Sequence, residues 1–497
     1  MKNNIFIILI LILNYIMFIN KLHIYQLNYY KFNKQVNYII RNYKKFIINV
    51  ILNILIIIFY NKFISYILLI ILIKYNFINK SKKKLIFTKK IIRYIIFLTL
   101  LNFIIIYSSS IKLIILLNIF IDLELFIIDI INKPINYLIN LIYIKLAKNK
   151  LKQYKNLIVI AITGSYGKTS VKNYLYNLLN IKYNVCMTPK NYNTDLGIVK
   201  SIREKLNIRN KMFIVEMGAT KVGDIDNICK IIKPSVSVIT NIGSMHLESF
   251  KTIDNIIKTK FEIYENSDVI FVNLDDENIK NNINIFNNKK IISFSSKDDT
   301  CDYYLSDIYM TNEITKFKVN FKGKIFNFET KLLGKHNIYN LFISLVIADY
   351  FNIDISKLKR EIYNMKNVEH RLNIKKYGNV TILDDSYNSN EIGSLNALNV
   401  LKSFDGYKIV VTPGMVEFGD KENEINYNFG KYILNSCDEV IFTNYNQTKF
   451  IYNALKDNNF NNIKYIENIK EVFDYVNKLN KEKIILLLEN DLPDQYY

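Results

Sequence analysis

The sequence predicts an α/β protein with two parallel-sheet domains, preceded by membrane-spanning helices. The N-terminal part consists of long apolar runs, with no acidic residue before Asp122. The remainder alternates short Ile- and Val-rich segments with helical patterns, which is typical of a parallel sheet covered by helices on both faces. A glycine-containing loop joins the first of these segments to a helix, and it carries a lysine and a threonine.

The apolar runs are the first elements along the chain. They cover Ile5–Ile19, Phe46–Tyr60, Phe63–Ile73, Ile91–Tyr107 and Ile111–Ile131. A helix needs about 20 residues to cross a bilayer, and we expect four or five spans. The first run lacks a small-residue cleavage site and further apolar runs follow, which predicts an uncleaved anchor. The alternative, a buried soluble helical domain, would require polar helix faces that these runs do not have.

The loops between the apolar runs are basic. Lysines and arginines gather at residues 31–45 and 80–90, and cytoplasmic loops carry such an excess. We therefore expect residues 1–140 to form a multi-pass region in the cell membrane, in contact with lipid, with the following domains on the cytoplasmic side. The formal net charge of +22 comes mostly from lysine, and nucleic acid is not an expected partner because its recognition favours arginine. The four cysteines include no C-x-x-C pair, which disfavours a zinc or redox motif.

Eight later segments are predicted strands, in two series. They are Leu157–Thr163, Phe213–Met217, Val236–Asn241, Val269–Asn273, Thr381–Asp384, Lys408–Thr412, Glu439–Thr443 and Ile484–Leu488. The two series predict a central domain at 146–369 with a P-loop-type parallel sheet, and a smaller Rossmann-like α/β domain at 370–497, with the boundary near His370. The Asn-rich stretch Asn278–Lys290 is predicted to be a surface loop.

The first predicted strand runs into the loop Gly164–Ser170, which reads Gly-Ser-Tyr-Gly-Lys-Thr-Ser, and a helix is expected from about Val171. Glycines let backbone N–H groups turn inward, a helix N-terminus favours an anion, and Lys168 adds a positive charge. The Thr169 hydroxyl can bind Mg²⁺. The pattern therefore predicts a phosphate site; the alternative is a simple glycine turn, which the scarcity of glycine in this chain disfavours.

Two further residues fit a metal site. Glu216 ends the strand expected beside the phosphate-binding strand, where its carboxylate can hold Mg²⁺ together with Thr169. His246 lies just past the next strand. A lone histidine is more often structural, but the chain has four histidines and three of them (His246, His336 and His370) fall inside the motifs described here, so a ligand role is favoured.

The segment Ile162–Ser170 resembles the ATP-binding loop of the Mur ligases, the enzymes that add amino acids to peptidoglycan precursors. Segments similar to later family motifs follow in the family's order: Thr188–Gly197, Val215–Ala219, Thr240–Glu248, Gly334–Asn340, His370–Arg371 and Asp384–Asn390. The last of these, with Pro413–Gly419, most resembles the branch that adds D-alanyl-D-alanine. The resemblance covers about Leu146 to Tyr497. It implies an ATP-dependent ligase that forms an amide bond through an acyl phosphate.

The resemblance also implies roles for single residues. The implied ATP-binding residues are Gly164, Ser165, Gly167, Lys168, Thr169, Ser170, His336, Asn337, Asn340, Arg371 and Asp385. The implied metal-binding residues, for two Mg²⁺ ions, are Thr169, Glu216, His246 and Lys260. The implied catalytic residues are Lys168, His246, Lys260 and Arg371. The implied substrate contacts are Asn191, Asn193, Asn388 and Asn390.

Two of these residues have a specific role in the family. Lys260 matches a lysine that is carbamylated in family members, although from the sequence alone it could be a solvated helix lysine. Arg371 resembles an arginine that reaches the γ-phosphate of ATP from the C-terminal domain. Such an arrangement suits domain closure, because the positive charge arrives only when the site shuts.

The chain departs from the family pattern in two places. Glu391 stands where a proline usually follows the last motif asparagine, which leaves amine selectivity open. The branch usually begins with a soluble domain that binds the UDP-sugar, whereas apolar segments stand here. The expected substrates are a muropeptide-like carboxylate, with UDP-N-acetylmuramoyl-tripeptide as donor, and D-alanyl-D-alanine, acted on by a monomer. One alternative is another ligase of the same superfamily, of the folylpolyglutamate or amino-acid-polymerising type, that acts on a different, lipid-linked carboxylate. The other alternative is a non-enzymatic membrane scaffold, which is disfavoured because every phosphate and metal position of the motifs is filled.

Overall fold

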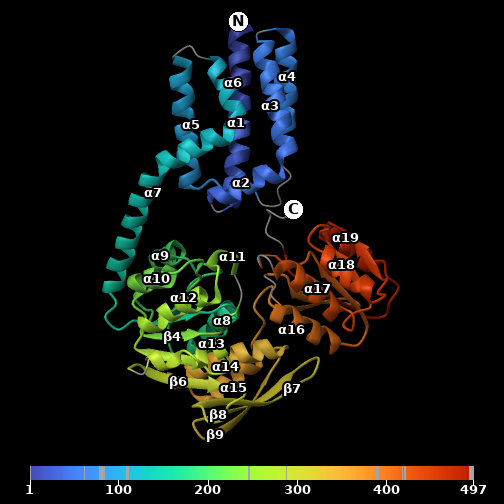
Figure 1. The fold of residues 1–497 in the computed structure, drawn as a ribbon. Helices are drawn as coiled ribbons and strands as arrows, with labels where there is room; N and C mark the ends of the chain where they lie inside the picture. The colour runs from blue at the N-terminus through green and yellow to red at the C-terminus, as the bar shows by residue number, and fades with distance from the viewer. Residues whose placement is uncertain are drawn as a thin grey trace. The chain divides into compact units, whose positions relative to one another are not determined.

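The computed structural model divides the chain into two compact units; the first ends at Leu141 and the second begins at Ile142. The described residues are 2–28, 30–60, 62–77, 84–107, 111–243, 247–286, 288–387, 391–416, 418 and 421–491. The first unit is helical, and the second contains two β-sheets with their covering helices (Figure 1). The predicted fold class, two α/β sheets after apolar helices, is confirmed.

The first unit is a helical bundle with its own apolar core. Its helices are α1 (Lys2–Leu27), α2 (Phe32–Arg41), α3 (Tyr43–Ile58), α4 (Phe63–Phe77), α5 (Lys89–Tyr107), α6 (Ile111–Ile119) and the first part of α7 (Ile121–Lys152). Fully buried side chains such as Ile10, Leu69 and Leu98 come from three different helices of the bundle. Large apolar side chains are also exposed along α3, α4 and α5, which is unusual for a surface in water.

Three helices are long and apolar enough to cross a membrane, at Ile5–Leu27, Lys89–Tyr107 and Ile121–Lys152, and the apolar helix at Phe63–Asn76 is shorter. The predicted number of spans, four or five, is therefore larger than the number of helices of sufficient length among the described residues. The run predicted from Ile111 to Ile131 is two helices instead of one, α6 and α7. The acidic first turn of α7, with Asp122 and Glu124, favours a helix N-terminus at that point.

The second unit begins with a nine-stranded sheet of order β2-β3-β1-β4-β5-β6-β7-β8-β9. Its strands are β1 (Ile158–Thr163), β2 (Val185–Met187), β3 (Met212–Glu216), β4 (Val236–Ile239), β5 (Val269–Asn273), β6 (Lys290–Ser295), β7 (Tyr303–Met310), β8 (Thr315–Phe321) and β9 (Lys324–Thr330). Pairing is parallel from β2 to β7 and antiparallel from β7 to β9. Strand β1 lies between β3 and β4, so the loops that follow these three strands meet at one edge of the sheet.

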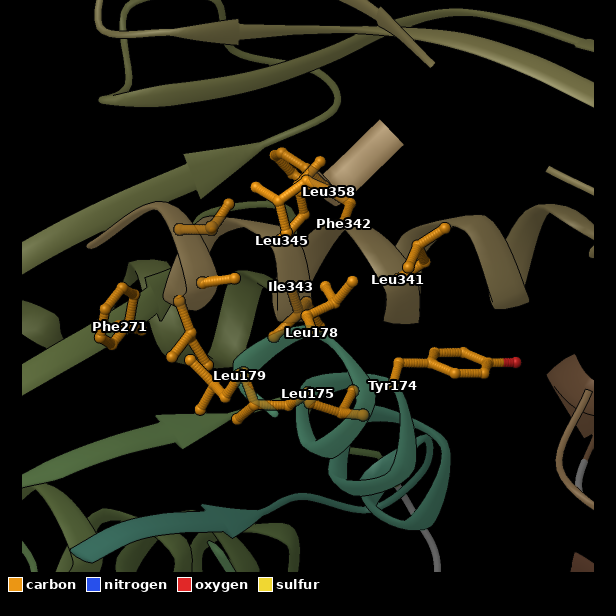
Figure 2. Packing of buried hydrophobic residues seen from close by; sticks show 14 of the residues in the cluster. Tyr174, Leu175, Leu178, Leu179, Phe271, Leu341, Phe342, Ile343, Leu345 and Leu358 are labelled. Atoms are coloured by element: carbon orange, nitrogen blue, oxygen red, sulfur yellow. The ribbon is translucent and has the colours of Figure 1, made fainter. Parts of the chain in front are cut away.

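Helices cover both faces of this sheet, because alternate side chains of a strand point to opposite faces. Ile160 and Ile162 of β1 belong to one apolar cluster, and Val159 and Ala161 belong to the other. The covering helices are α8 (Lys168–Leu179), α9 (Asp195–Glu204), α10 (Asp224–Ile232), α11 (Leu247–Phe250), α12 (Ile253–Glu265), α13 (Glu277–Lys280), α14 (Lys335–Tyr350) and α15 (Ile355–Tyr363). Figure 2 shows leucines of α8 interleaved with apolar side chains of α14, which fixes the helix that follows the glycine loop.

A second sheet follows, with six strands in the order β10-β11-β15-β12-β13-β14. Its strands are β10 (Asn373–Tyr377), β11 (Val380–Asp385), β12 (Tyr407–Thr412), β13 (Glu439–Phe442), β14 (Ile463–Tyr465) and β15 (Ile484–Glu489). Only the β10–β11 pair is antiparallel. Its helices are α16 (Glu391–Lys402), α17 (Glu422–Ile433), α18 (Lys449–Asp457) and α19 (Ile469–Asn477).

All eight predicted strands are present, with ends shifted by at most two residues. The sequence reasoning missed β2, β6 to β10 and β14. The stretch Asn278–Lys290, predicted to be a surface loop, instead carries most of α13 and a 3₁₀ turn at Ile283–Phe286. Ile279 and Phe286 are buried in the core, which holds this stretch against the sheet.

Candidate active site

The glycine loop connects β1 to α8, as predicted, and its shape requires glycine. Gly167 has a φ of +78° and caps the N-terminus of α8. A Cβ at Gly167 would lie 2.3 Å from Oδ1 of Asn340, and a Cβ at Gly164 would lie 2.0 Å from Oγ1 of Thr240. Side chains from α14 and from the end of β4 therefore press on the loop backbone from two sides.

The loop is also held by hydrogen bonds to the segment after β4. The backbone N–H of Ser165 donates to the carbonyl of Asn241 at 2.9 Å, and the N–H of Tyr166 donates to Oδ1 of Asn241 at 2.8 Å. The backbone N–H of Gly243 donates to Oγ of Ser165 at 2.8 Å. These bonds fix the loop. The first backbone N–H groups of any helix have no hydrogen-bond partner within the helix, so those of α8 can donate to a phosphate.

Lys168 lies within this loop, with its ammonium on loop carbonyls. Its Nζ donates to the carbonyls of Gly164 at 2.7 Å and of Ser165 at 3.0 Å. Burial lowers the pKa of Lys168 to about 8, Glu216 opposes that shift, and Arg371 adds to it. The group is therefore a partly buried cation at the start of a helix, which suits the binding of a polyphosphate.

Glu216 lies at the centre of the site, at the end of β3. Thr169 donates through Oγ1 to Oε1 of Glu216 at 3.1 Å, and Asn193 donates through Nδ2 to the same oxygen at 3.2 Å. The other oxygen, Oε2, forms an ion pair of 2.9 Å with Nζ of Lys172, and the two side chains are 2% and 1% exposed. The predicted pairing of Thr169 with Glu216 is thus present in the geometry. Lys172 was missed, because a lysine one turn into a helix gives no sign in the sequence that it faces the core.

Lys260 reaches the same place from α12. Its Nζ donates to Oγ1 of Thr163 at 3.4 Å, and Thr163 in turn donates to the carbonyl of Met217. Burial, together with the positive charge of the nearby Lys168, lowers the pKa of Lys260 to about 7. With 4% of its surface exposed, Lys260 is not the solvated helix lysine that the sequence left as an alternative.

Arg371 comes from the segment that leads into the second sheet. Its neighbours His370 and Leu372 have φ values of +60° and +52°, a conformation that non-glycine residues seldom adopt. The guanidinium of Arg371 lies over the ring of Tyr387, 4.4 Å from its centroid. Its positive charge contributes to the lowered pKa of Lys168 and of His336. That Arg371 reaches the γ-phosphate of ATP stays a prediction.

Carboxylates at the end of β11 contact the residues on each side of Arg371. Oδ1 of Asp385 accepts the backbone N–H of Leu372 at 3.0 Å. Asp384 pairs with Nδ1 of His370 and with Nζ of Lys375, each at 3.0 Å. Burial raises the pKa of Asp385 to about 6, against the lowering effect of Arg371. These contacts explain how an unfavourable backbone conformation persists at this position.

The residues predicted on the adenine side lie at the start of α14. His336 has a buried Nδ1 that has no hydrogen-bond partner within the described chain, and burial lowers the pKa of its ring to about 4. A neutral ring with a free nitrogen suits contact with a nucleotide. Asn337 differs, since its amide donates to the carbonyl of Leu333 and accepts from the hydroxyl of Tyr174 at 3.3 Å. Its contact with a nucleotide stays a prediction.

The remaining predicted residues are less defined. Ser170 is buried in the first turn of α8, and Asn191 is exposed, with its carbonyl accepting the N–H of Asn193 at 2.8 Å. His246, Asn388 and Asn390 lie outside the described residues, so their predicted roles stay predictions. Within the described ranges, no cluster of three or more His, Cys, Asp or Glu side chains is arranged to hold a metal.

The fold and the loop together define a nucleotide-binding enzyme of P-loop type with a second α/β domain. Sequence profiles of two known domains match this chain: the Mur ligase middle domain at residues 162–348, and the Mur ligase, glutamate ligase domain at residues 370–488. The helical unit lies outside both matched ranges.

Related proteins agree with these profiles. A UDP-N-acetylmuramoyl-tripeptide–D-alanyl-D-alanine ligase of Buchnera aphidicola subsp. Baizongia pistaciae is 31% identical over 346 residues, covering 68% of this chain and 73% of that protein. The Bacillus subtilis ligase of the same name is 28% identical over 290 residues, covering 57% and 62%. The MurF ligase of Thermotoga maritima in complex with ADP matches with a TM-score of 0.62 at 26% identity, covering 70% of this chain and 80% of that one. The chain belongs to the Mur ligase family.

Proposed function

We propose that this chain is an ATP-dependent ligase of peptidoglycan precursor synthesis, which joins UDP-N-acetylmuramoyl-tripeptide to D-alanyl-D-alanine. The observation that carries the proposal is the convergence of Lys168, Thr169 and Glu216 at the ends of β1 and β3, with Arg371 supplied from the second sheet. Relatives with that ligase name, one of them 31% identical, support the choice of substrates.

The chemistry follows from the charges in the site. A substrate carboxylate oxygen attacks the γ-phosphorus of ATP, the bond to the β-phosphate oxygen breaks, and ADP leaves with its electron pair. Lys168 and Arg371 neutralise charge on the transferred group, and the N–H groups at the start of α8 hold its oxygens. The amine of D-alanyl-D-alanine then attacks the acyl carbon and phosphate leaves, so the amide forms without a protein nucleophile.

The residues present also fit Mg²⁺. A hydroxyl and a carboxylate oxygen, both of them ligands that Mg²⁺ accepts, meet at 3.1 Å between Thr169 and Glu216. A bound Mg²⁺ would supply positive charge to the phosphates of ATP. We infer a second site at His246 and a carbamylated Lys260. The support is the lowered pKa of Lys260, about 7, because only the neutral amine adds CO₂, with release of a proton, to form a carbamate.

We also propose that the helical unit holds the enzyme in the cell membrane as a multi-pass monomer, with the catalytic sheets on the cytoplasmic side. Three helices of sufficient length and apolarity support this, together with the exposed apolar side chains along α3 to α5. Membrane fractionation of the full chain, with alkaline carbonate extraction, tests it. Complete release of the protein into the soluble fraction would contradict the proposal.

The helical unit also keeps one alternative open, which is a Mur-type ligase that acts on another carboxylate, presented on a lipid. The activity test separates the two. The full-length protein is incubated with ATP, Mg²⁺, UDP-N-acetylmuramoyl-tripeptide and D-alanyl-D-alanine, and phosphate release is measured with each component omitted in turn. We expect release that requires both substrates, with the pentapeptide product detected by mass. ATP binding without release would favour the lipid-linked carboxylate.

A further inference from the structure

The helical unit contains a polar cavity of about 50 Å³ where the ends of several helices meet. One water molecule needs about 10–15 Å³, so the cavity has room for about three to five waters or one phosphate-sized group. Five asparagines and two lysines are among its fourteen lining residues, and none of the lining residues is acidic. Such a lining is rich in hydrogen-bond donors.

Asn118 supplies a donor that the fold leaves unused. Its side chain is 1% exposed and lines the cavity. Oδ1 of Asn118 accepts a hydrogen bond of 3.0 Å from Nδ2 of Asn14, but its own Nδ2 has no partner in the part of the chain that the structure describes. A buried amide without an acceptor costs free energy. The Nδ2 atom has almost no accessible surface, so an acceptor atom in the cavity reaches it, and removes this cost, only after a small shift of a neighbouring side chain.

Two other asparagines that line the cavity have amide groups whose hydrogen bonds are made within the protein. Nδ2 of Asn76 donates to Oδ1 of Asn49 at 2.9 Å and to the carbonyl of Leu72 at 3.0 Å, and Nδ2 of Asn49 donates to the carbonyl of Lys45 at 3.1 Å. These amides tie α3 to α4 and need no ligand. Asn118 is therefore distinguished from them by its unused donor.

The charge in the cavity is positive. Lys21 is paired with Asp122 at 2.6 Å, and that carboxylate is not among the lining residues. Lys45 has no ion pair with a described carboxylate, and its Nζ lies 5.6 Å from the centre of the Tyr75 ring. One lysine charge is thus balanced and one is not. An oxyanion with several acceptor oxygens matches one free ammonium and one free amide N–H₂.

The apolar side chains that line the cavity favour an anion that carries an alkyl chain. Met17, Ile24, Ile39, Phe46 and Ile119 are side chains that an alkyl chain can lie against. The cavity is near the C-terminal ends of α1 and α4 and the N-terminal ends of α3 and α7. The basic loops of the sequence adjoin these same ends, which is the depth at which lipid headgroups lie on the cytoplasmic side.

We propose that this cavity binds the phosphate group of an anionic lipid, with Lys45 and Asn118 as donors and the acyl chain against the apolar side chains. The proposal rests on the membrane attachment proposed above and is independent of the ligase reaction. It assigns to the helical unit a specific lipid contact in addition to anchoring.

The test measures lipid binding to the full-length protein in detergent by native mass spectrometry. The probes are phosphatidic acid, phosphatidylcholine of equal chain length, and inorganic phosphate. We expect phosphatidic acid to bind at one site and to be retained at least about tenfold more tightly than phosphatidylcholine. Its phosphomonoester carries more negative charge and one more free oxygen than the phosphodiester of phosphatidylcholine, which also bears a bulky choline cation. Lys45→Gln and Asn118→Asp should each weaken this binding by about tenfold. Asn118→Asp keeps the oxygen that accepts from Asn14, and only the donor changes.

Lys74→Gln is the matched control, because Lys74 lies exposed on α4 and does not line the cavity. It should leave lipid binding unchanged. Equal retention of the two lipids would overturn the proposal, as would unchanged binding in both Lys45→Gln and Asn118→Asp. Inorganic phosphate that binds as tightly as phosphatidic acid would overturn the assignment to a lipid. Phosphate release with the ligase substrates, measured on the same preparations, should not change, so failure of either proposal is seen separately.

Discussion

Replacement of Lys172 by methionine tests whether the ion pair with Glu216 holds the site together. The pair is 2.9 Å long, and both side chains are almost completely buried. Removal of one partner from a buried ion pair costs about 3–5 kcal/mol, because the remaining charge keeps its desolvation penalty. Glu216 would keep its bonds from Thr169 and Asn193, so we expect a loss at the lower end, about 3 kcal/mol.

Thermal unfolding of the full-length protein, followed by circular dichroism, measures this loss. About 3 kcal/mol corresponds to a fall in Tm of roughly 6–12 °C for a domain of 150–250 residues. Mg²⁺ with ATP should restore more of the Tm in Lys172→Met than in the wild type, because the metal supplies a positive charge beside the same carboxylate. Lys200→Met, at an exposed lysine of α9, is the control, and it should change stability by less than about 0.5 kcal/mol.

The double variant with Glu216→Gln decides the cause. If the cost comes from an unpaired buried charge, Lys172→Met should cost much less when Glu216 is already neutral. An equal cost in both backgrounds, or a loss below about 1 kcal/mol in the wild-type background, would refute the reasoning.

Three further predictions concern the glycine loop and Lys260. Lys168→Ala should abolish ATP-dependent phosphate release, whereas substantial residual turnover would count against the site. Gly167→Ala places a methyl group 2.3 Å from Oδ1 of Asn340 at a φ of +78°, so ATP binding measured by calorimetry should fall at least about tenfold, and unchanged binding would contradict the loop geometry. Lys260 has a pKa of about 7 when folded and 10.5 as its ordinary value, so the unfolded chain binds more protons between these values and stability should rise with pH across that window. Lys260→Met should flatten this rise in urea unfolding, and identical slopes would contradict the burial of the ammonium.

Much of the site could be predicted because it depends on local order along the chain. A strand, two glycines, a lysine and a threonine specify the loop, and a carboxylate at the end of the neighbouring strand specifies Glu216, since parallel strands bring their carboxyl ends together. The position of Lys260 came only from the family resemblance. Its burial against Thr163 depends on how α12 packs on β1, which no local pattern encodes.

Other features were missed for different reasons. The alternation of Lys316, Phe317, Lys318 and Val319 is a strand signal that was present and not used, and β8 shows the matching pattern of exposed and buried side chains. The left-handed backbone at His370 and Leu372 carries no glycine or asparagine, so nothing local predicts it. That conformation is imposed by the contacts with Asp384 and Asp385.

The outer strands of the nine-stranded sheet have a consequence for self-association. One border is β2, which has only three residues, and the other is β9, which carries the charged residues Lys324 and Glu329. The backbone of an outer strand can pair with a further chain, and a short strand or charged side chains at the border suppress that pairing. A protein gathered on a surface meets its own copies far more often than one in free solution. These blunt borders let such encounters end without growth of a fibrous sheet.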